Sequence, residues 1–75
     1  VDIGGGSTEV VLSSGGVVEH LSSLRLGAVR LTERFPGIED TDPAVYARVR
    51  RFIDRQIREA VGKPPLTPQV MIGTG

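Results

Sequence analysis

Three consecutive glycines near the start of the chain constrain its fold more than any other feature of the sequence. They lie between two segments with strand character, Val1 to Ile3 and Thr8 to Leu12, and Ser7 extends them to a loop of small residues. Glycine permits the positive φ angles of tight turns, so this stretch favours a reversal of the chain. A second turn signal, Ser13-Ser14-Gly15-Gly16, precedes a third strand-like segment from Val17 to Leu26. The sequence therefore predicts a meander of two hairpins.

The loop of the first hairpin has the composition of a phosphate-binding loop. Without Cβ atoms, backbone N–H groups can converge on a concave site that a phosphate oxygen approaches closely. The neighbouring serine and threonine add hydroxyl donors at the edge of the loop. We therefore expect phosphate to bind at Gly4, Gly5, Gly6, Ser7 and Thr8. The alternative is a flexible hairpin tip that binds nothing.

Two acidic residues flank this loop. If Gly4 to Ser7 form a four-residue loop, Asp2 faces Glu9 across the two strands. Carboxylates directly opposite each other repel, and a divalent cation between them removes that repulsion. Mg²⁺ commonly binds to one or two carboxylates together with phosphate oxygens, so Asp2 and Glu9 are the candidate Mg²⁺ ligands. The alternative is that water solvates both acids at the strand ends.

Two helices are predicted after the third strand. Residues 27–35 carry apolar side chains at helical spacing and end at Pro36-Gly37. The longer helix has Asp42 as its N-cap, Pro43 at its first position and Gly62 as its stop signal. Its apolar residues form one stripe, which is expected to pack on a sheet or on another helix. These residues are Val45, Val49, Phe52, Ile53, Ile57, Ala60 and Val61.

A short apolar run from Gln69 to Ile72 is predicted to be a fourth strand. The resulting order, β-β-β-α-α-β, indicates an α/β fold with a mixed sheet, in which the last strand is parallel to a neighbour. This order resembles a ribonuclease H-like half of the actin-like ATPases, although other α/β folds share it. Because both ends of the chain read as cuts through a larger fold, we expect residues 1–75 to be a single truncated subdomain of a two-domain enzyme.

Three parts of the sequence together resemble the exopolyphosphatase / guanosine pentaphosphate phosphatase (Ppx/GppA) family of the actin-like ATPase superfamily. The string DIGGGSTE, residues 2–9, is similar to the second phosphate-binding loop of that family. The string SLRLGAVRLTERF, residues 23–35, is similar to the segment that follows, and Gly73-Thr74-Gly75 looks like the start of a later Gly/Thr-rich turn. The resemblance covers nearly the whole chain in the expected order.

The resemblance implies a Mg²⁺-dependent phosphohydrolase that releases terminal phosphate from inorganic polyphosphate or guanosine pentaphosphate. It implies that Gly4 to Ser7 line the phosphate site and that Asp2 and Glu9 lie near Mg²⁺. The family's glutamate base and first phosphate loop belong to a part of the enzyme that is not in this chain. We therefore assign no catalytic residue here and expect the 75 residues alone to be inactive. Alternatives are another actin-like ATPase, a sugar or acetate kinase, or a non-catalytic phosphate-sensing module.

Charge and composition narrow the possible partners. Lys+Arg and Asp+Glu both number 9, so no global field favours nucleic acid or an anionic membrane. Arg25 and Arg30 flank the Leu26-Gly27 corner, where a structural role is favoured over contact with phosphate. No membrane-spanning or signal segment is evident, which indicates a cytoplasmic protein. A sheet with open edges and apolar surface is expected to self-associate into homo-oligomers.

Overall fold

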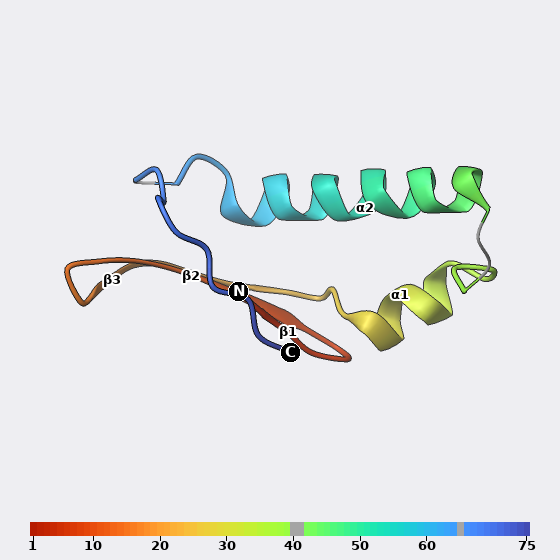
Figure 1. The fold of residues 1–75 in the computed structure, drawn as a ribbon, viewed down its shortest axis with the longest axis horizontal. Coiled ribbons are helices and arrows are strands. Elements are labelled where there is room, and N and C mark those ends of the chain that lie inside the picture. The colour runs from red at the N-terminus through yellow and green to blue at the C-terminus, as the bar shows by residue number, and fades with distance from the viewer. Residues whose placement is uncertain (40–41, 65) are drawn as a thin grey trace.

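The computed structural model describes residues 1–39, 42–64 and 66–75, and it shows three strands followed by two helices (Figure 1). The strands are β1 (Asp2–Ile3), β2 (Thr8–Ser14) and β3 (Val17–Leu24), and the helices are α1 (Ala28–Arg34) and α2 (Pro43–Val61). The strands form one antiparallel sheet in the order β1-β2-β3. The α/β class and the meander followed by two helices agree with the sequence prediction.

The two hairpins have the turns that the glycines predict, with different backbone conformations. In the second hairpin, Gly15 and Gly16 have φ angles of 57° and 80°, a region that favours glycine. In the first hairpin, the N–H of Gly4 donates to the carbonyl of Ser7 at 2.9 Å, and no glycine of the loop has a positive φ. The glycines of the first loop are therefore not required by a positive φ angle, whereas Gly15 and Gly16 of the second turn are.

Strand β3 ends two residues earlier than the predicted boundary at Leu26. Its last residue, Leu24, lies opposite Thr8, which is the first residue of β2. Beyond Thr8 the neighbouring chain turns away into the glycine loop, so no strand remains for residues 25 and 26 to pair with. Leu26 is nevertheless buried, at the corner where the chain enters α1.

Helix α2 has the predicted bounds because its signals are local. The side chain of Asp42 accepts a hydrogen bond from the N–H of Ala44 at 2.9 Å, which caps the first turn. At the other end, Gly62 has a φ of 61° and its N–H donates to the carbonyl of Arg58. Figure 1 shows α2 lying along one face of the sheet, and the hydroxyl of Ser22 donates to the carbonyl of Ala60 there at 3.3 Å.

The predicted fourth strand at Gln69–Ile72 is wrong, because those residues are not in a strand. The chain instead makes one parallel bridge slightly later, between Asp2 and Thr74. The N–H of Ile3 donates to the carbonyl of Thr74, and the N–H of Thr74 donates to the carbonyl of Val1, both at 2.8 Å. Because β1 is only two residues long, it offers one bridge and cannot support a longer parallel strand.

The core of the molecule is thin. The buried apolar side chains are Leu24, Leu26 and Val49, where β3, the corner and α2 meet. The radius of gyration of 13.8 Å exceeds the value of about 11 Å typical of a compact domain of this length. Part of the predicted apolar stripe of α2 stays in solvent, since Ile57 is 41% exposed. Neither helix of the described part is long and apolar enough to cross a membrane.

Candidate phosphate-binding loop

The first turn of α1 holds the glycine loop through backbone hydrogen bonds. The N–H of Ala28 donates to the carbonyl of Gly4 at 3.1 Å, and the N–H groups of Val29 and Arg30 donate to the carbonyl of Gly5 at 3.0 and 3.3 Å. The first N–H groups of a helix have no acceptor within the helix, and α1 has no side-chain cap. The loop carbonyls therefore take the place of a cap, and they lie at the end of the helix that favours negative charge.

The side chain of Arg30 continues the same arrangement. Its Nε donates to the carbonyl of Gly6, the next residue of the loop. The structural role expected for Arg30 is thus confirmed. Three successive carbonyl groups of the loop, from Gly4 to Gly6, are directed towards α1.

Gly27 makes this close approach possible. A Cβ atom built on Gly27 would lie 2.4 Å from the carbonyl oxygen of Gly5 and 2.6 Å from that of Gly4. Real Cβ atoms essentially never approach backbone atoms so closely, so Gly27 is required by space. The sequence marks a corner at Leu26-Gly27 but does not indicate that Gly27 belongs to the site. Its place at the helix N-cap gave no signal, because glycine is common at that position.

The direction of the carbonyl groups determines where the N–H groups of the loop point. In a trans peptide, the C=O of one residue and the N–H of the next point in opposite directions, and the described residues contain no cis peptide. Carbonyls of Gly4, Gly5 and Gly6 that face α1 therefore turn the N–H groups of Gly5, Gly6 and Ser7 away from α1. Within the described part of the chain, these three N–H groups have no acceptor. The loop thus offers three unpaired donors on the side opposite the helix.

The two hydroxyl groups expected at the edge of the loop have partners within the protein. Thr8 is buried, and its Oγ1 donates to the carbonyl of Leu26 at 2.6 Å. The Oγ of Ser7 donates to Oε1 of Glu9 at 2.9 Å. Thr8 therefore fixes the corner beside the loop, while Ser7 connects the loop to one of the two flanking acids.

Asp2 and Glu9 lie directly opposite each other in the β1–β2 ladder, as predicted. Opposed residues of neighbouring strands point to the same face of a sheet, so both carboxylates lie on one side. Asp2 Oδ1 accepts a hydrogen bond from Thr74 Oγ1 at 2.8 Å, and Glu9 Oε1 accepts a second bond from Ser23 Oγ at 3.3 Å. These hydroxyls orient both carboxylates beside the loop.

The donor set suits Mg²⁺ rather than a metal that needs a complete protein cage. In residues 1–39, 42–64 and 66–75, no group of three or more acidic, histidine or cysteine side chains is placed to hold a metal ion. Mg²⁺ usually keeps several waters and binds through one or two carboxylates plus the phosphates of a substrate. Asp2 and Glu9, which face each other beside the glycine loop, supply two carboxylates of this kind.

The fold and the loop together define a small α/β unit with a candidate anion site at a hairpin tip that is held by a helix. The model of the Ppx/GppA phosphatase family matches residues 1–73. The chain belongs to this family, which confirms the resemblance found in the sequence.

One relative extends the comparison. The uncharacterized protein SCO0757 of Streptomyces coelicolor is 38% identical over 65 residues, which cover 84% of this chain and 19% of the relative. The chain therefore spans about a fifth of the length of the relative it matches. No solved structure matches the chain.

Proposed function

We propose that this chain forms the second phosphate-binding loop of a cytoplasmic phosphohydrolase that releases terminal phosphate from inorganic polyphosphate or guanosine pentaphosphate. We also propose that it is part of a ribonuclease H-like, actin-like subdomain. The observation that carries the proposal is the set of unpaired N–H groups at Gly5, Gly6 and Ser7, all turned away from α1. Membership of a phosphatase family supports the same chemistry.

The loop contributes positioning and charge stabilisation. Phosphoryl transfer leaves little covalent work to the protein and depends on donors that are already oriented towards the phosphate oxygens. Here α1 holds the peptide planes of Gly4 to Gly6 through their carbonyl groups. The N–H groups are thus oriented before a ligand arrives, and little conformational entropy remains to be lost on binding.

Asp2 and Glu9 would hold Mg²⁺ beside this site. When bound, the ion would neutralise part of the negative charge on the phosphate groups. The hydroxyl of Thr74 bonds to Asp2, and the hydroxyls of Ser7 and Ser23 bond to Glu9, so each carboxylate has a defined orientation. The charge of the ion would also offset the repulsion between two acids that face each other.

The 75 residues alone are proposed to bind phosphate without hydrolysing it. Both acids beside the loop are assigned to the metal, and the resemblance places the general base on a part of the enzyme outside this chain. Release of phosphate from polyphosphate by the isolated chain at high protein concentration would contradict this assignment.

Gly6 offers the sharpest test of the loop. A Cβ at Gly6 would have Arg30 Nε at 3.8 Å as its nearest neighbour, an ordinary contact distance, and Gly6 has no positive φ. Gly6→Ala should therefore fold normally, while its methyl group adds bulk to a loop whose backbone a phosphate must approach closely. We expect orthophosphate to shift the amide resonances of Gly5, Gly6 and Ser7 in ¹H–¹⁵N NMR spectra. We expect Gly6→Ala to weaken this binding about tenfold or more.

The matched control is Gly73→Ala, whose added methyl has no neighbour within 4 Å. It should bind orthophosphate as the unsubstituted chain does. Equal binding by Gly6→Ala and Gly73→Ala, or shifts spread evenly over the molecule, would refute the loop as the phosphate site.

The identity of the substrate has to be tested in a longer protein that contains these 75 residues and is about as long as the Streptomyces relative. Orthophosphate release from polyphosphate and from guanosine pentaphosphate, each with Mg²⁺, should identify one or both as substrates. Binding without release would favour the phosphate-sensing module. Transfer of the γ-phosphate of ATP to a sugar or to acetate would favour a kinase.

A further inference from the structure

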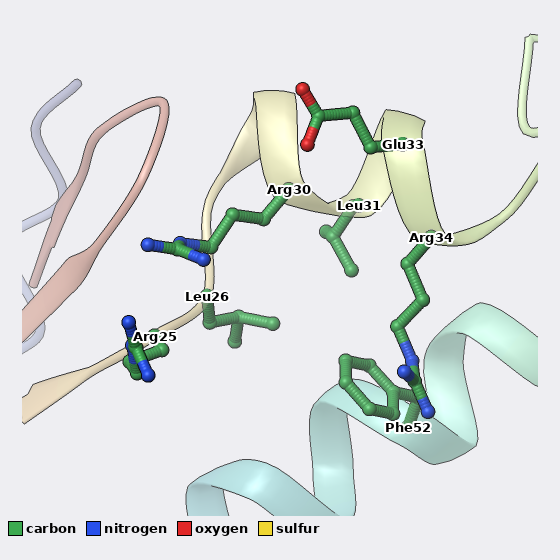
Figure 2. Close-up of a pocket in the computed structure, with 7 residues that line it drawn as sticks. All are labelled: Arg25, Leu26, Arg30, Leu31, Glu33, Arg34 and Phe52. Atoms are coloured by element: carbon green, nitrogen blue, oxygen red, sulfur yellow. The ribbon is translucent and has the colours of Figure 1, made fainter.

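A hollow of about 620 Å³ lies at the corner between β3 and α1, behind the glycine loop. Three arginines line it, namely Arg25, Arg30 and Arg34. Figure 2 shows their side chains around an apolar floor of Leu26, Leu31 and Phe52. The lining adjoins the loop at two points, where Arg30 donates to the carbonyl of Gly6 and Leu26 accepts from Thr8, but it contains none of the residues from Gly4 to Thr8.

The positive charge of the hollow is not neutralised by neighbouring acids. Among the described residues, Arg58 and Asp54 form an ion pair on the exposed side of α2. None of the three arginines of the hollow takes part in an ion pair there. Glu33 is the one acidic residue of the lining, and Figure 2 shows its carboxylate pointing away from Arg25 and Arg34. Because the whole chain has a formal net charge of zero, this is a local concentration of positive charge.

Two of the guanidinium groups are already held in place. The guanidinium of Arg34 lies 4.4 Å from the centre of the Phe52 ring, which itself packs edge to face on Phe35 at 5.3 Å. Arg30 uses its Nε on the carbonyl of Gly6, which leaves its two terminal nitrogens available as donors. Planar guanidinium groups fixed in this way match the oxygens of a phosphate group.

We propose that the hollow is a second anion site, which binds a polyanion with several linked phosphate groups: Arg25 and Arg30 contact one phosphate, and Arg34, on the other side of Phe52, contacts another (Figure 2). The site lies on the α1 side of the loop, whereas the unpaired N–H groups of Gly5 to Ser7 face the other side. It does not depend on the loop amides and would exist even if they bound nothing. Because a phosphatase of this family acts on phosphate compounds, a ligand with several linked phosphate groups is the class that both sites suit.

The test is a titration of the chain with tripolyphosphate, followed through the Nε–Hε resonances of its arginines. We expect the resonances of Arg25, Arg30 and Arg34 to shift together and those of the exposed helix residue Arg55 to stay unchanged. Arg25→Gln should weaken binding at the hollow about three- to tenfold, since it removes one charge-assisted contact from an exposed position. Arg25 is exposed and makes no described hydrogen bond, so the variant is expected to fold.

Arg55→Gln is the control, because it removes the same charge from α2 outside the hollow. Equal weakening by Arg25→Gln and Arg55→Gln would show non-specific attraction and overturn the proposal. Shifts of the loop amides without shifts of the hollow arginines would also overturn it, while leaving the proposed function intact. Shifts of the arginines without shifts of the loop would support the hollow and contradict the phosphate loop.

Discussion

Replacing Gly27 with alanine should uncouple the glycine loop from α1. Gly27 has a φ of −171°, an extended conformation that alanine adopts readily, so the effect comes from space rather than from backbone strain. The new methyl group would lie 2.4 and 2.6 Å from the carbonyl oxygens of Gly5 and Gly4. The loop must therefore move away from the helix, and the hydrogen bonds donated by Ala28 and Val29 lengthen or break.

The expected loss of stability follows from these contacts. Each of the two hydrogen bonds contributes about 0.5–1.5 kcal/mol net, and overpacking by one methyl group costs about 1–3 kcal/mol. We expect Gly27→Ala to lower the free energy of unfolding by about 2–6 kcal/mol in total. A chain of 75 residues has about 4–11 kcal/mol available, and the thin core places this molecule towards the lower end. The variant should thus be close to unfolded at room temperature.

Urea unfolding followed by circular dichroism measures this loss as a lower midpoint at an unchanged slope. Gly73→Ala serves again as the control, because its methyl group meets no neighbour and should change stability by less than about 0.5 kcal/mol. Amide hydrogen exchange at Ala28 and Val29 should also become faster in Gly27→Ala. A midpoint for Gly27→Ala equal to that of Gly73→Ala would refute the view that α1 holds the loop.

Two further predictions concern the acids and the surface. Asp2→Asn keeps an oxygen for Thr74 but removes the repulsion with Glu9, so it should raise stability by about 0.2–1 kcal/mol without Mg²⁺ and abolish any stabilisation by Mg²⁺. Thermal melts with and without Mg²⁺ check this, and equal stabilisation of both proteins by Mg²⁺ would contradict the metal site. Leu21 is 67% exposed beside Val11 on the open face of the sheet, so the chain should self-associate and Leu21→Lys should shift it towards monomer. Light scattering that shows a clean monomer of the unsubstituted chain at high concentration would contradict this.

The features that were predicted from the sequence are those that local chemistry determines. The bounds of α2 follow from Asp42 and Gly62, which make their capping contacts within the same turn of helix. The register that opposes Asp2 to Glu9 follows from the length of the loop alone. The placement of the final segment was wrong because β1 bridges Thr74, which lies beyond the apolar run of residues 69–72, and the sequence does not state which residue pairs with β1.

The packing of the loop on α1 was not predicted, since it joins residues more than twenty positions apart. The residues next to Gly27 in the sequence do not indicate that Gly27 packs against the backbone carbonyls of Gly4 and Gly5. In the same way, composition alone assigned the Thr8 hydroxyl to ligand binding. In the structure this buried hydroxyl donates to the carbonyl of Leu26 instead. The sequence predicts a phosphate site at this loop, and the structure shows which of its groups are already used within the protein.

The three consecutive glycines of the loop are not equivalent, because their surroundings differ. An added Cβ would lie 3.1 Å from the Ser7 carbonyl at Gly4 and 3.2 Å from the Val29 side chain at Gly5, so both positions are tight for reasons of packing. Gly6 alone among the three has ordinary room for a methyl group. Packing therefore explains two of the glycines, and the proposed function assigns the third to a ligand that must reach the backbone. Because folding and binding make different demands on these glycines, Gly6→Ala should lower phosphate affinity without lowering stability, whereas Gly27→Ala should lower both.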